Sequence, residues 1–254
     1  MPGGLIVVMG TMHRVGAIYL LSICLPPGIL PGAERIAFQG PLTIENVLRD
    51  PVTVHAGDFD ADGKLDLVCS NGSGTVSVLL QDPLDRQAWK ASHVRVGSSS
   101  YFTRGGDFDG DGADDLVVAD GASTAYYVRS QGDGTFERPV PITQARGPRW
   151  AAVGDWNGDG RLDVATANLG TSTLTIFVNE VTVEGTPRFR MTQPPPNGRA
   201  HALEALDFDG DGVLDLVLGM GSVGIELHRG KGDGTFTYTP SNVGEVGCAQ
   251  HVSC

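Results

Sequence analysis

The sequence predicts an all-β fold, a β-propeller built from four-stranded blades, on three observations. First, one nine-residue acidic motif occurs four times, at intervals of 48 to 52 residues. Second, a short apolar run follows each copy directly, as expected of a strand. Third, the 36 glycines and the scarcity of helical periodicity favour many short strands joined by tight turns. A motif that returns about every 50 residues is typical of an array of supersecondary units, and four strands per unit describe propeller blades.

The four motif copies space their oxygen side chains in a way that suits calcium. They read DFDADGKLD from Asp58, DFDGDGADD from Asp107, DWNGDGRLD from Asp155 and DFDGDGVLD from Asp207, and we number them loops 1 to 4. Side-chain oxygens at positions 1, 3, 5 and 9, with a main-chain carbonyl at position 7, can surround one ion. Ca²⁺ prefers six to eight oxygen ligands at about 2.3–2.6 Å. Glycine at position 6 allows the positive φ that wraps such a loop, and without a cation the carboxylates would repel one another.

Two other interpretations of the motif are weaker. A single copy would fit an Asp-Gly hairpin turn on a solvated surface, but four copies in register make that explanation improbable. An EF-hand requires a bidentate Glu at position 12 and helical flanks. Position 12 holds Cys69, Val118, Thr166 or Leu218, and the flanks have the composition of strands. The sequence therefore predicts up to four Ca²⁺ loops between strands.

The acidic composition supports a capacity to bind cations. The net charge is −12, and 16 of the 30 Asp and Glu residues lie in the four loops when Asp114 is included. Such acidity argues against a nucleic-acid surface, which would be basic. The four cysteines show no zinc-site spacing. Cys69 is expected in the core, whereas Cys248 and Cys254 could close a short loop, a pairing that the sequence leaves open.

Residues 1–33 resemble a secretory signal segment. Val15–Leu25 is an apolar run of suitable length, and a boundary of small residues follows at Pro31–Ala33. The run is too short for a comfortable membrane span. Two alternatives remain: a lipid anchor at Cys24, although Ile23 stands where a small residue is needed, or a buried strand. We expect a secreted or cell-surface protein whose repeats fill residues 34–254.

The repeats share a common order of predicted strands. Each loop is followed by a strand, a polar turn and a second strand; the first strands are 65–70, 115–119, 162–167 and 214–219, and the second are 75–80, 124–129, 173–179 and 224–229. A Gly-Asp-Gly-Thr-Phe hairpin then starts a third strand at Phe136 and at Phe236. Longer connectors, 82–88 and 180–187, replace it in the other two repeats. A fourth strand leads into the next loop, so each loop is expected to join one blade to the next.

The phrase GDFDGDGxxDLVV at 106–118, with GDGTF at 132–136, resembles the FG-GAP/VCBS repeats, over roughly residues 38–254. These repeats form the propellers of integrin α-chains and of many secreted bacterial proteins. The resemblance implies that aromatic residues at position 2 pack between blades: Phe59, Phe108, Trp156 and Phe208. It implies these side-chain ligands: Asp58, Asp60, Asp62, Asp66, Asp107, Asp109, Asp111, Asp115, Asp155, Asn157, Asp159, Asp163, Asp207, Asp209, Asp211 and Asp215. The position 7 carbonyls belong to Lys64, Ala113, Arg161 and Val213. Asn157 keeps an oxygen but removes a charge, so loop 3 is expected to bind more weakly.

The number of blades is smaller than this family usually has. Phe38 is placed as the start of the closing half of an earlier blade, which gives about four and a half blades, whereas family members close a ring with about seven. The sequence therefore predicts an incomplete or open ring. Three explanations compete: a truncated reading frame, an open arc, or a ring completed by another copy. Open edges expose strands and apolar faces, so we also expect self-association or docking of missing blades there.

Three functions remain open at this stage, and none depends on a recognisable catalytic motif. The sequence contains no HExxH, P-loop or GxSxG, and the GxGxxG at 219–224 precedes a strand. The leading hypothesis is a secreted, calcium-stabilised interaction module for a protein or glycan, without enzymatic activity. The rival is a carbohydrate-active propeller enzyme, a lyase or hydrolase, that would use residues near the axis; the candidates are His55, Tyr101, Arg104, Arg149, Trp150 and His201. The third is a structural repeat within a larger surface protein.

Overall fold

A computed structural model describes residues 47–48, 50–82, 84–85, 88–122, 124–142, 147–183, 186–192, 200–220 and 224–239. All of them lie within one structural unit, residues 46–252. The expectations for the signal segment, for Cys24, for the half-blade from Phe38 and for Cys248 and Cys254 concern residues outside this description. Within it, no helix is long and apolar enough to cross a membrane.

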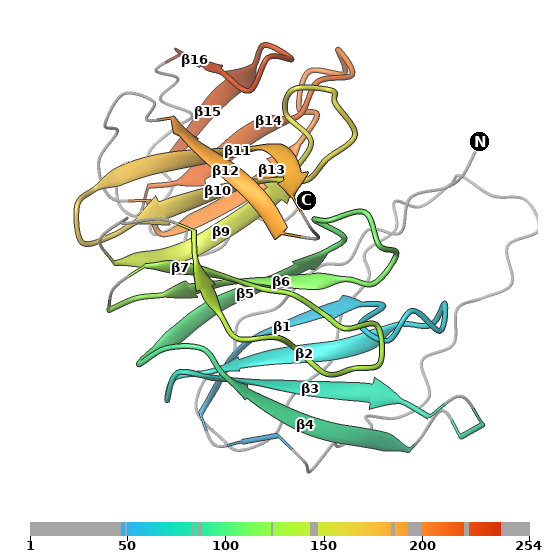
Figure 1. Cartoon of the computed structure of the whole chain (residues 1–254). Helices are drawn as coiled ribbons and strands as arrows, with labels where there is room; N and C mark the ends of the chain where they lie inside the picture. The colour runs from blue at the N-terminus through green and yellow to red at the C-terminus, as the bar shows by residue number, and fades with distance from the viewer. Residues whose placement is uncertain are drawn as a thin grey trace, which may run out of the picture. The chain divides into compact units, whose positions relative to one another are not determined.

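The described residues form sixteen strands in four sheets, which confirms an all-β fold of four-stranded blades (Figure 1). Blade 1 contains β1 (Pro51–Gly57), β2 (Asp66–Asn71), β3 (Thr75–Gln81) and β4 (Trp89–Arg95). Blade 2 contains β5 (Ser100–Gly106), β6 (Asp115–Asp120), β7 (Ala125–Val128) and β8 (Val140–Pro141). Blade 3 contains β9 (Pro148–Gly154), β10 (Asp163–Asn168), β11 (Thr173–Val183) and β12 (Thr186–Thr192). Blade 4 contains β13 (Ala202–Leu206), β14 (Asp215–Gly219), β15 (Ile225–Gly230) and β16 (Phe236–Thr239).

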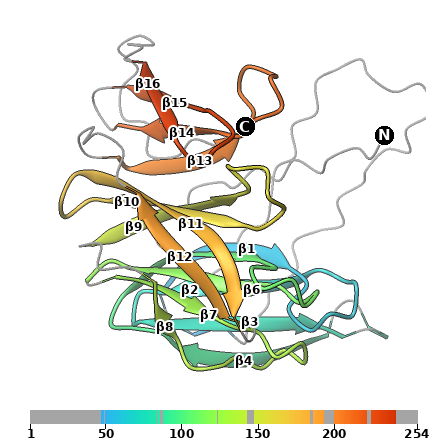
Figure 2. The ribbon, with the colours of Figure 1, turned by 45° about the horizontal axis from the view of Figure 1, so that its top comes forward.

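Each blade is an antiparallel meander whose strands pair in chain order (Figure 2). The acidic loop connects the first and second strands of the same blade: Gly57 pairs with Asp66 across loop 1, and Gly106 pairs with Asp115 across loop 2. The expectation that these loops join one blade to the next was therefore wrong. The chain reverses direction within the nine residues of the loop, so the strand before the loop and the strand after it pair as a hairpin.

The outer strands vary most between the blades. In blade 3 the predicted connector 180–187 is largely strand, because β11 continues to Val183 and β12 begins at Thr186. In blade 2 only a single bridge forms at Phe136, and the strand β8 begins later, at Val140. In blade 4 the outer strand begins at Phe236, as predicted.

The apolar core is divided among three clusters, each of which lies between two consecutive blades. Alternate side chains of one strand point to opposite faces of a sheet. In β6, Leu116 and Val118 accordingly pack toward blade 1, whereas Val117 packs toward blade 3. The third cluster joins Ile176 of blade 3 to Leu216 of blade 4. No blade buries its apolar faces alone, so each depends on its neighbours for stability.

The aromatic residue at position 2 of loops 1 to 3 packs against the following blade. Ring centroids lie 6.1 Å apart between Phe59 and Phe136, 6.2 Å between Phe108 and Phe189, and 6.0 Å between Trp156 and Phe236. These three position 2 side chains are buried. Phe208 is 59 % exposed. The predicted packing role is thus confirmed for three aromatic residues, and no described residue covers the fourth.

A second contact between blades needs glycine just before the loop. Leu162 of blade 3 lies over Gly106 of blade 2, and Leu214 of blade 4 lies over Gly154 of blade 3, so closely that a Cβ on either glycine would clash. Blade 4 has Leu206 at this position. Close approach of the backbone to a neighbouring side chain therefore explains these glycines.

Truncation of a position 2 aromatic should be costly only where a following blade covers it. Phe108→Ala is expected to lower the free energy of unfolding by about 3–5 kcal/mol, because it leaves a cavity in a buried cluster. Phe208→Ala is the matched control and should change it by less than about 0.5 kcal/mol. Urea unfolding of both variants measures the difference. Equal losses would contradict the assignment of these contacts.

Candidate metal centres

The side chain at position 1 holds each loop in shape through the backbone. The carboxylate of Asp107 accepts hydrogen bonds from the N–H groups of Asp111, at 3.1 Å, and Gly112, at 3.1 Å. The corresponding Asp58, Asp155 and Asp207 bind their loops in the same way. The glycines at position 6 have φ between 81° and 93°, as the sequence predicted. Asp at position 1 and glycine at position 6 together fix the curvature of each loop.

The aspartate at position 9 is buried and ties three parts of the blade together. In blade 2, Asp115 Oδ2 accepts the N–H of Phe108 at 3.3 Å, and its Oδ1 accepts the N–H of Ser130 at 2.7 Å. Tyr127 donates its hydroxyl to the same carboxylate at 2.8 Å. Burial raises the pKa of Asp115 to about 7, and that of Asp66 and Asp163 to about 6. A nearby cation would favour the charged form of these groups.

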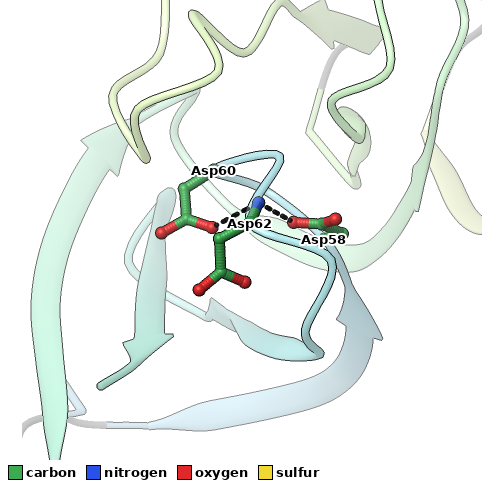
Figure 3. A group of neighbouring side chains, drawn as sticks. All are labelled: Asp58, Asp60 and Asp62. Atoms are coloured by element: carbon green, nitrogen blue, oxygen red, sulfur yellow. Dashed lines mark hydrogen bonds between the residues drawn. The ribbon is translucent and has the colours of Figure 1, made fainter. Parts of the chain in front are cut away.

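Three of the four loops bring carboxylates close enough to share an ion. Carboxylate oxygens lie within 4.8 Å of one another in three groups: Asp58, Asp60 and Asp62; Asp107, Asp109 and Asp115; Asp207, Asp209 and Asp215. Figure 3 shows the first group gathered around the Asp62 amide, which donates to Asp58 and Asp60. A donor set made only of oxygens suits a hard divalent cation such as Ca²⁺.

Loop 3 differs because position 3 is an amide. Asn157 donates its Nδ2 group to Asp159 Oδ2 at 2.8 Å, which satisfies that carboxylate within the loop. The carboxylates of Asp155, Asp159 and Asp163 form no close group of the kind seen in the other loops as far as the described residues go. Loop 3 thus offers one carboxylate fewer at the ligand positions than the other loops, and a weaker site stays a prediction.

The N–H group at position 7 points into its own loop in all four copies. It donates to the carboxylate at position 5 over 2.8–3.0 Å; the donors are Lys64, Ala113, Arg161 and Val213, and the acceptors are Asp62, Asp111, Asp159 and Asp211. The position 5 carboxylates are thereby held toward the loop. Among the described residues, the predicted ligands Asp66, Asp111 and Asp211 belong to none of the three close carboxylate groups, so the full ligand set stays a prediction.

Asp114 at position 8 of loop 2 links two candidate sites. Its carboxylate accepts the N–H of Asp58 at 3.0 Å, and its own N–H donates to the Asp58 carbonyl at 2.7 Å. Burial raises the pKa of Asp114, and the nearby charges of Asp58 and Asp107 act in the same direction. Two hydrogen bonds of Asp114 therefore join loops 1 and 2. The sequence had indicated for this residue only a contribution to the negative charge of loop 2.

Three of the residues considered for an axial enzyme site, Arg104, Arg149 and Trp150, contact residues of another blade. Arg104 of β5 donates to Glu204 of β13 at 3.1 Å, although blade 3 lies between their blades in the chain. Its guanidinium also lies 4.4 Å from the centroid of the Phe102 ring. Sequence analysis missed Glu204. Its position in the sequence could have indicated this pairing, because Glu204 precedes loop 4 by three residues, just as Arg104 precedes loop 2.

The remaining axial candidates lie on the first strands or beside them. Arg149 lies 4.1 Å from the centroid of the Tyr101 ring, and Trp150 packs edge-on against Phe102 at 5.0 Å. His201 uses its backbone N–H to bind the Gly219 carbonyl at 2.7 Å. The contacts of Arg149 and Trp150 join the first strands of blades 2 and 3, whereas the His201 bond lies within blade 4 and involves only the backbone.

Comparison with known families agrees with this geometry. The FG-GAP-like repeat matches residues 107–166 and 155–218, and the FG-GAP repeat matches residues 51–79. Together these matches span more than half of the chain. The chain belongs to the FG-GAP repeat family. The matched FG-GAP segments contain all four acidic loops, whereas the strand before loop 2, β5, lies outside them.

Solved structures are only distantly similar to this chain. The structures of BBS1N in complex with ARL6DN, soaked with mercury and with lead, give TM-scores of 0.48 and 0.46 at 14 % and 16 % identity. They cover 75 % and 85 % of this chain, and this chain spans only 54 % and 58 % of theirs. An auxiliary nutrient binding protein from Bacteroides ovatus gives a TM-score of 0.41 at 14 % identity, over 68 % of this chain and 37 % of its own. No curated protein matches the sequence.

Loop 1 carries a strained residue whose replacement by glycine should stabilise the protein. Ala61 at position 4 has φ of 57°, whereas the other loops have glycine there, at 72° to 81°. A left-handed conformation costs an alanine about 1–2 kcal/mol, part of which glycine loses again as chain entropy. Ala61→Gly should therefore raise the free energy of unfolding by about 0.5–1 kcal/mol, measured by urea unfolding. The reverse change in loop 3, Gly158→Ala, should lower it, and the same sign for both variants would contradict the argument.

Protonation of His55 should destabilise the fold in mildly acidic solution. Burial and the neighbouring Arg104 charge lower the pKa of His55 to about 4. An unfolded histidine has a pKa of about 6.5, so the stability that depends on neutral His55 is complete above about pH 6.5 and is lost as the pH falls toward 4. The advantage of the wild type over His55→Gln should therefore shrink by on the order of 1–2 kcal/mol between pH 7 and pH 5.

Urea unfolding at both pH values tests this pH dependence. His93→Gln, on the outer strand β4, controls for the loss of a histidine as such. An advantage that stays constant or grows on acidification would show that His55 does not contribute in this way.

Proposed function

We propose that this FG-GAP propeller is a secreted interaction module whose acidic loops bind Ca²⁺ as a structural ion. The observation that carries the proposal is the convergence of carboxylate oxygens within 4.8 Å in loops 1, 2 and 4. Oxygen-only coordination is typical of calcium, and magnesium demands a stricter octahedral geometry. Loop 3, with Asn157, would be the weakest of the four sites.

Calcium in these loops would stabilise contacts within and between blades. Each loop joins the first two strands of a blade, and loops 1 to 3 carry the position 2 aromatic that packs against the next blade. The ion would neutralise the mutual repulsion of the carboxylates. Since the loop is shaped only in the folded chain, calcium would bind the native state and shift the folding equilibrium toward it.

The partner we propose is an extracellular protein or glycan that binds the exposed surfaces of the blades. Secretion is supported by the apolar segment at 15–25. Large apolar side chains are exposed on blade 1 at Leu65 (54 %) and on blade 4 at Phe208 (59 %). Exposed apolar surface of this kind often marks contact sites for other molecules.

An interaction module fits the axial residues better than a carbohydrate-active enzyme does. A catalytic acid, base or cation must be able to reach a substrate. Arg104 is instead bonded to Glu204 and stacked on Phe102, and Arg149 is stacked on Tyr101. These contacts favour a scaffolding role for the axial strands.

Calcium should raise the melting temperature of the full chain. At a calcium concentration 100 times the dissociation constant, one site adds about 2.7 kcal/mol, which corresponds to at least about 5 °C for a domain of this size. Thermal unfolding in millimolar Ca²⁺, in Mg²⁺ and in chelator measures the effect. Asp60→Ala should reduce the calcium response, whereas Asp133→Asn, which removes a charge from a turn outside the loops, should retain it. A melting temperature that is the same in calcium and in chelator would disprove the calcium role.

A further inference from the structure

We infer that each acidic loop carries one built-in basic side chain that occupies part of the cation's place and is displaced when Ca²⁺ binds. This inference rests on the proposed calcium function and adds a regulator of affinity to it. The regulators are Lys64 for loop 1, Arg129 for loop 2, Arg161 for loop 3 and Arg229 for loop 4.

Each of the four side chains forms an ion pair with a carboxylate of its own loop. Lys64 Nζ lies 2.7 Å from Asp62, and Arg161 is paired with Asp159. Arg229 is the most distant, at 3.5 Å from Asp209. All three acidic partners are candidate ligands at position 3 or 5, so the basic groups contact the oxygens that a metal ion would use.

Arg129 makes the most extensive contact. Its Nε lies 2.5 Å from Asp109 Oδ2, and its Nη2 lies 2.9 Å from Asp111 Oδ2, so one guanidinium bridges positions 3 and 5 of loop 2. A third, longer contact of 3.5 Å reaches Glu137. The guanidinium thus brings a positive charge between two candidate ligands, as a bound metal ion would.

The basic residues come from two different places in the blade, and each blade uses only one of them. One place is position 7 of the loop. The other is on or just after the third strand, immediately before the residue whose N–H binds the position 9 aspartate. The pairs in chain order are Lys64 with Leu80, Ala113 with Arg129, Arg161 with Val178, and Val213 with Arg229. Every pair contains one basic and one apolar residue. The alternation indicates that each loop requires one positive charge, and that this charge can come from either of the two places.

Packing explains which place each blade uses. Leu80 and Val178 are buried under the Gly-Asp-Gly turn of the following blade, where Gly134 and Gly234 approach so closely that a Cβ would touch them. A charged side chain could not be buried there without a partner. Blades 1 and 3 therefore carry the charge at position 7, whereas Arg129 is covered by no such turn, because blade 3 has the hairpin of β11 and β12 in its place.

The inference gives each basic side chain two effects of opposite sign. Without calcium, the ion pair relieves the repulsion among the carboxylates and stabilises the loop. With calcium, the ion pair must be broken, which lowers the affinity of the site. A residue with a merely structural role would stabilise the protein in both conditions and would leave the affinity unchanged.

The decisive experiment compares wild-type full chain with Arg129→Gln during a titration with Ca²⁺ alone. The amide of Gly112 donates to Asp107 Oδ2 at 3.1 Å, so its nuclear magnetic resonance signal reports loop 2. The matching amides of Gly63, Gly160 and Gly212 report the other loops. The affinity of loop 2 should rise roughly three- to tenfold, the range expected for one displaced ion pair at a partly exposed site. The melting temperature in chelator should fall.

Two further variants control the comparison. Arg138→Gln removes the same charge from an exposed residue of blade 2 that makes none of the ion pairs found in the described part of the chain, and it should change neither quantity. Arg229→Gln acts on a side chain that is 52 % exposed, so it should fold even if Arg129→Gln does not, and it should show the same signs with a smaller rise at Gly212.

The outcomes separate this inference from the proposed function. If the wild-type glycine signals respond to calcium but the affinity of loops 2 and 4 is unchanged or lower in the variants, the inference is overturned and the calcium role stands. If no wild-type signal responds to calcium, both are overturned. A rise confined to the altered loop, together with a loss of stability in chelator, supports both.

Discussion

Each blade depends on the hydrogen bonds that the buried aspartate at position 9 accepts from the backbone. Asp66, Asp115, Asp163 and Asp215 each accept the N–H of the position 2 residue with one oxygen and an N–H at the end of the third strand with the other. One side chain thus fixes the loop, the second strand and the third strand together. Hydrogen bonds to charged groups contribute about 1.5–3 kcal/mol, and a buried carboxylate that lost its donors would be far more costly. The aromatic contacts between blades follow from it, because the same aspartate orients the position 2 residue.

Stability in this chain is a property of pairs of blades. Each sheet contributes one face to the core before it and the other to the core after it, as Leu116 and Val117 of β6 show. Such arrays resemble one-dimensional systems in which neighbour contacts dominate. The ion pair between Arg104 and Glu204 adds a different kind of link, because it joins blades that are not consecutive and brings together residues 100 positions apart. It fixes the first strands of blades 2 and 4 with respect to each other.

The sequence was sufficient for the fold class, the family and the positions of the loops, because the motif is repeated four times and each copy carries its own turn chemistry. It also placed Phe59, Phe108 and Trp156 between blades. It did not reveal that the loops lie within blades, since two strands that flank a loop show the same alternation whether or not they pair with each other. Glu204 was missed because only the shared register of the first strands connects it with Arg104. The basic partners of the loops were equally hidden, because Arg129 and Arg229 lie far in sequence from the carboxylates that they contact.

Leu206 makes the surface that blade 4 presents to a following blade different from that of the other blades. In blades 1 to 3 the glycine before the loop lies against the position 8 side chain of the next blade, whereas blade 4 has Leu206 at the same position. The side chain that meets the glycine is Asp114 at the first junction and leucine, Leu162 or Leu214, at the other two. A leucine at this position would clash with a position 8 side chain placed as at the other junctions, because even a Cβ on those glycines has no room. Blade 4 therefore offers a following unit a different surface from that of blades 1 to 3.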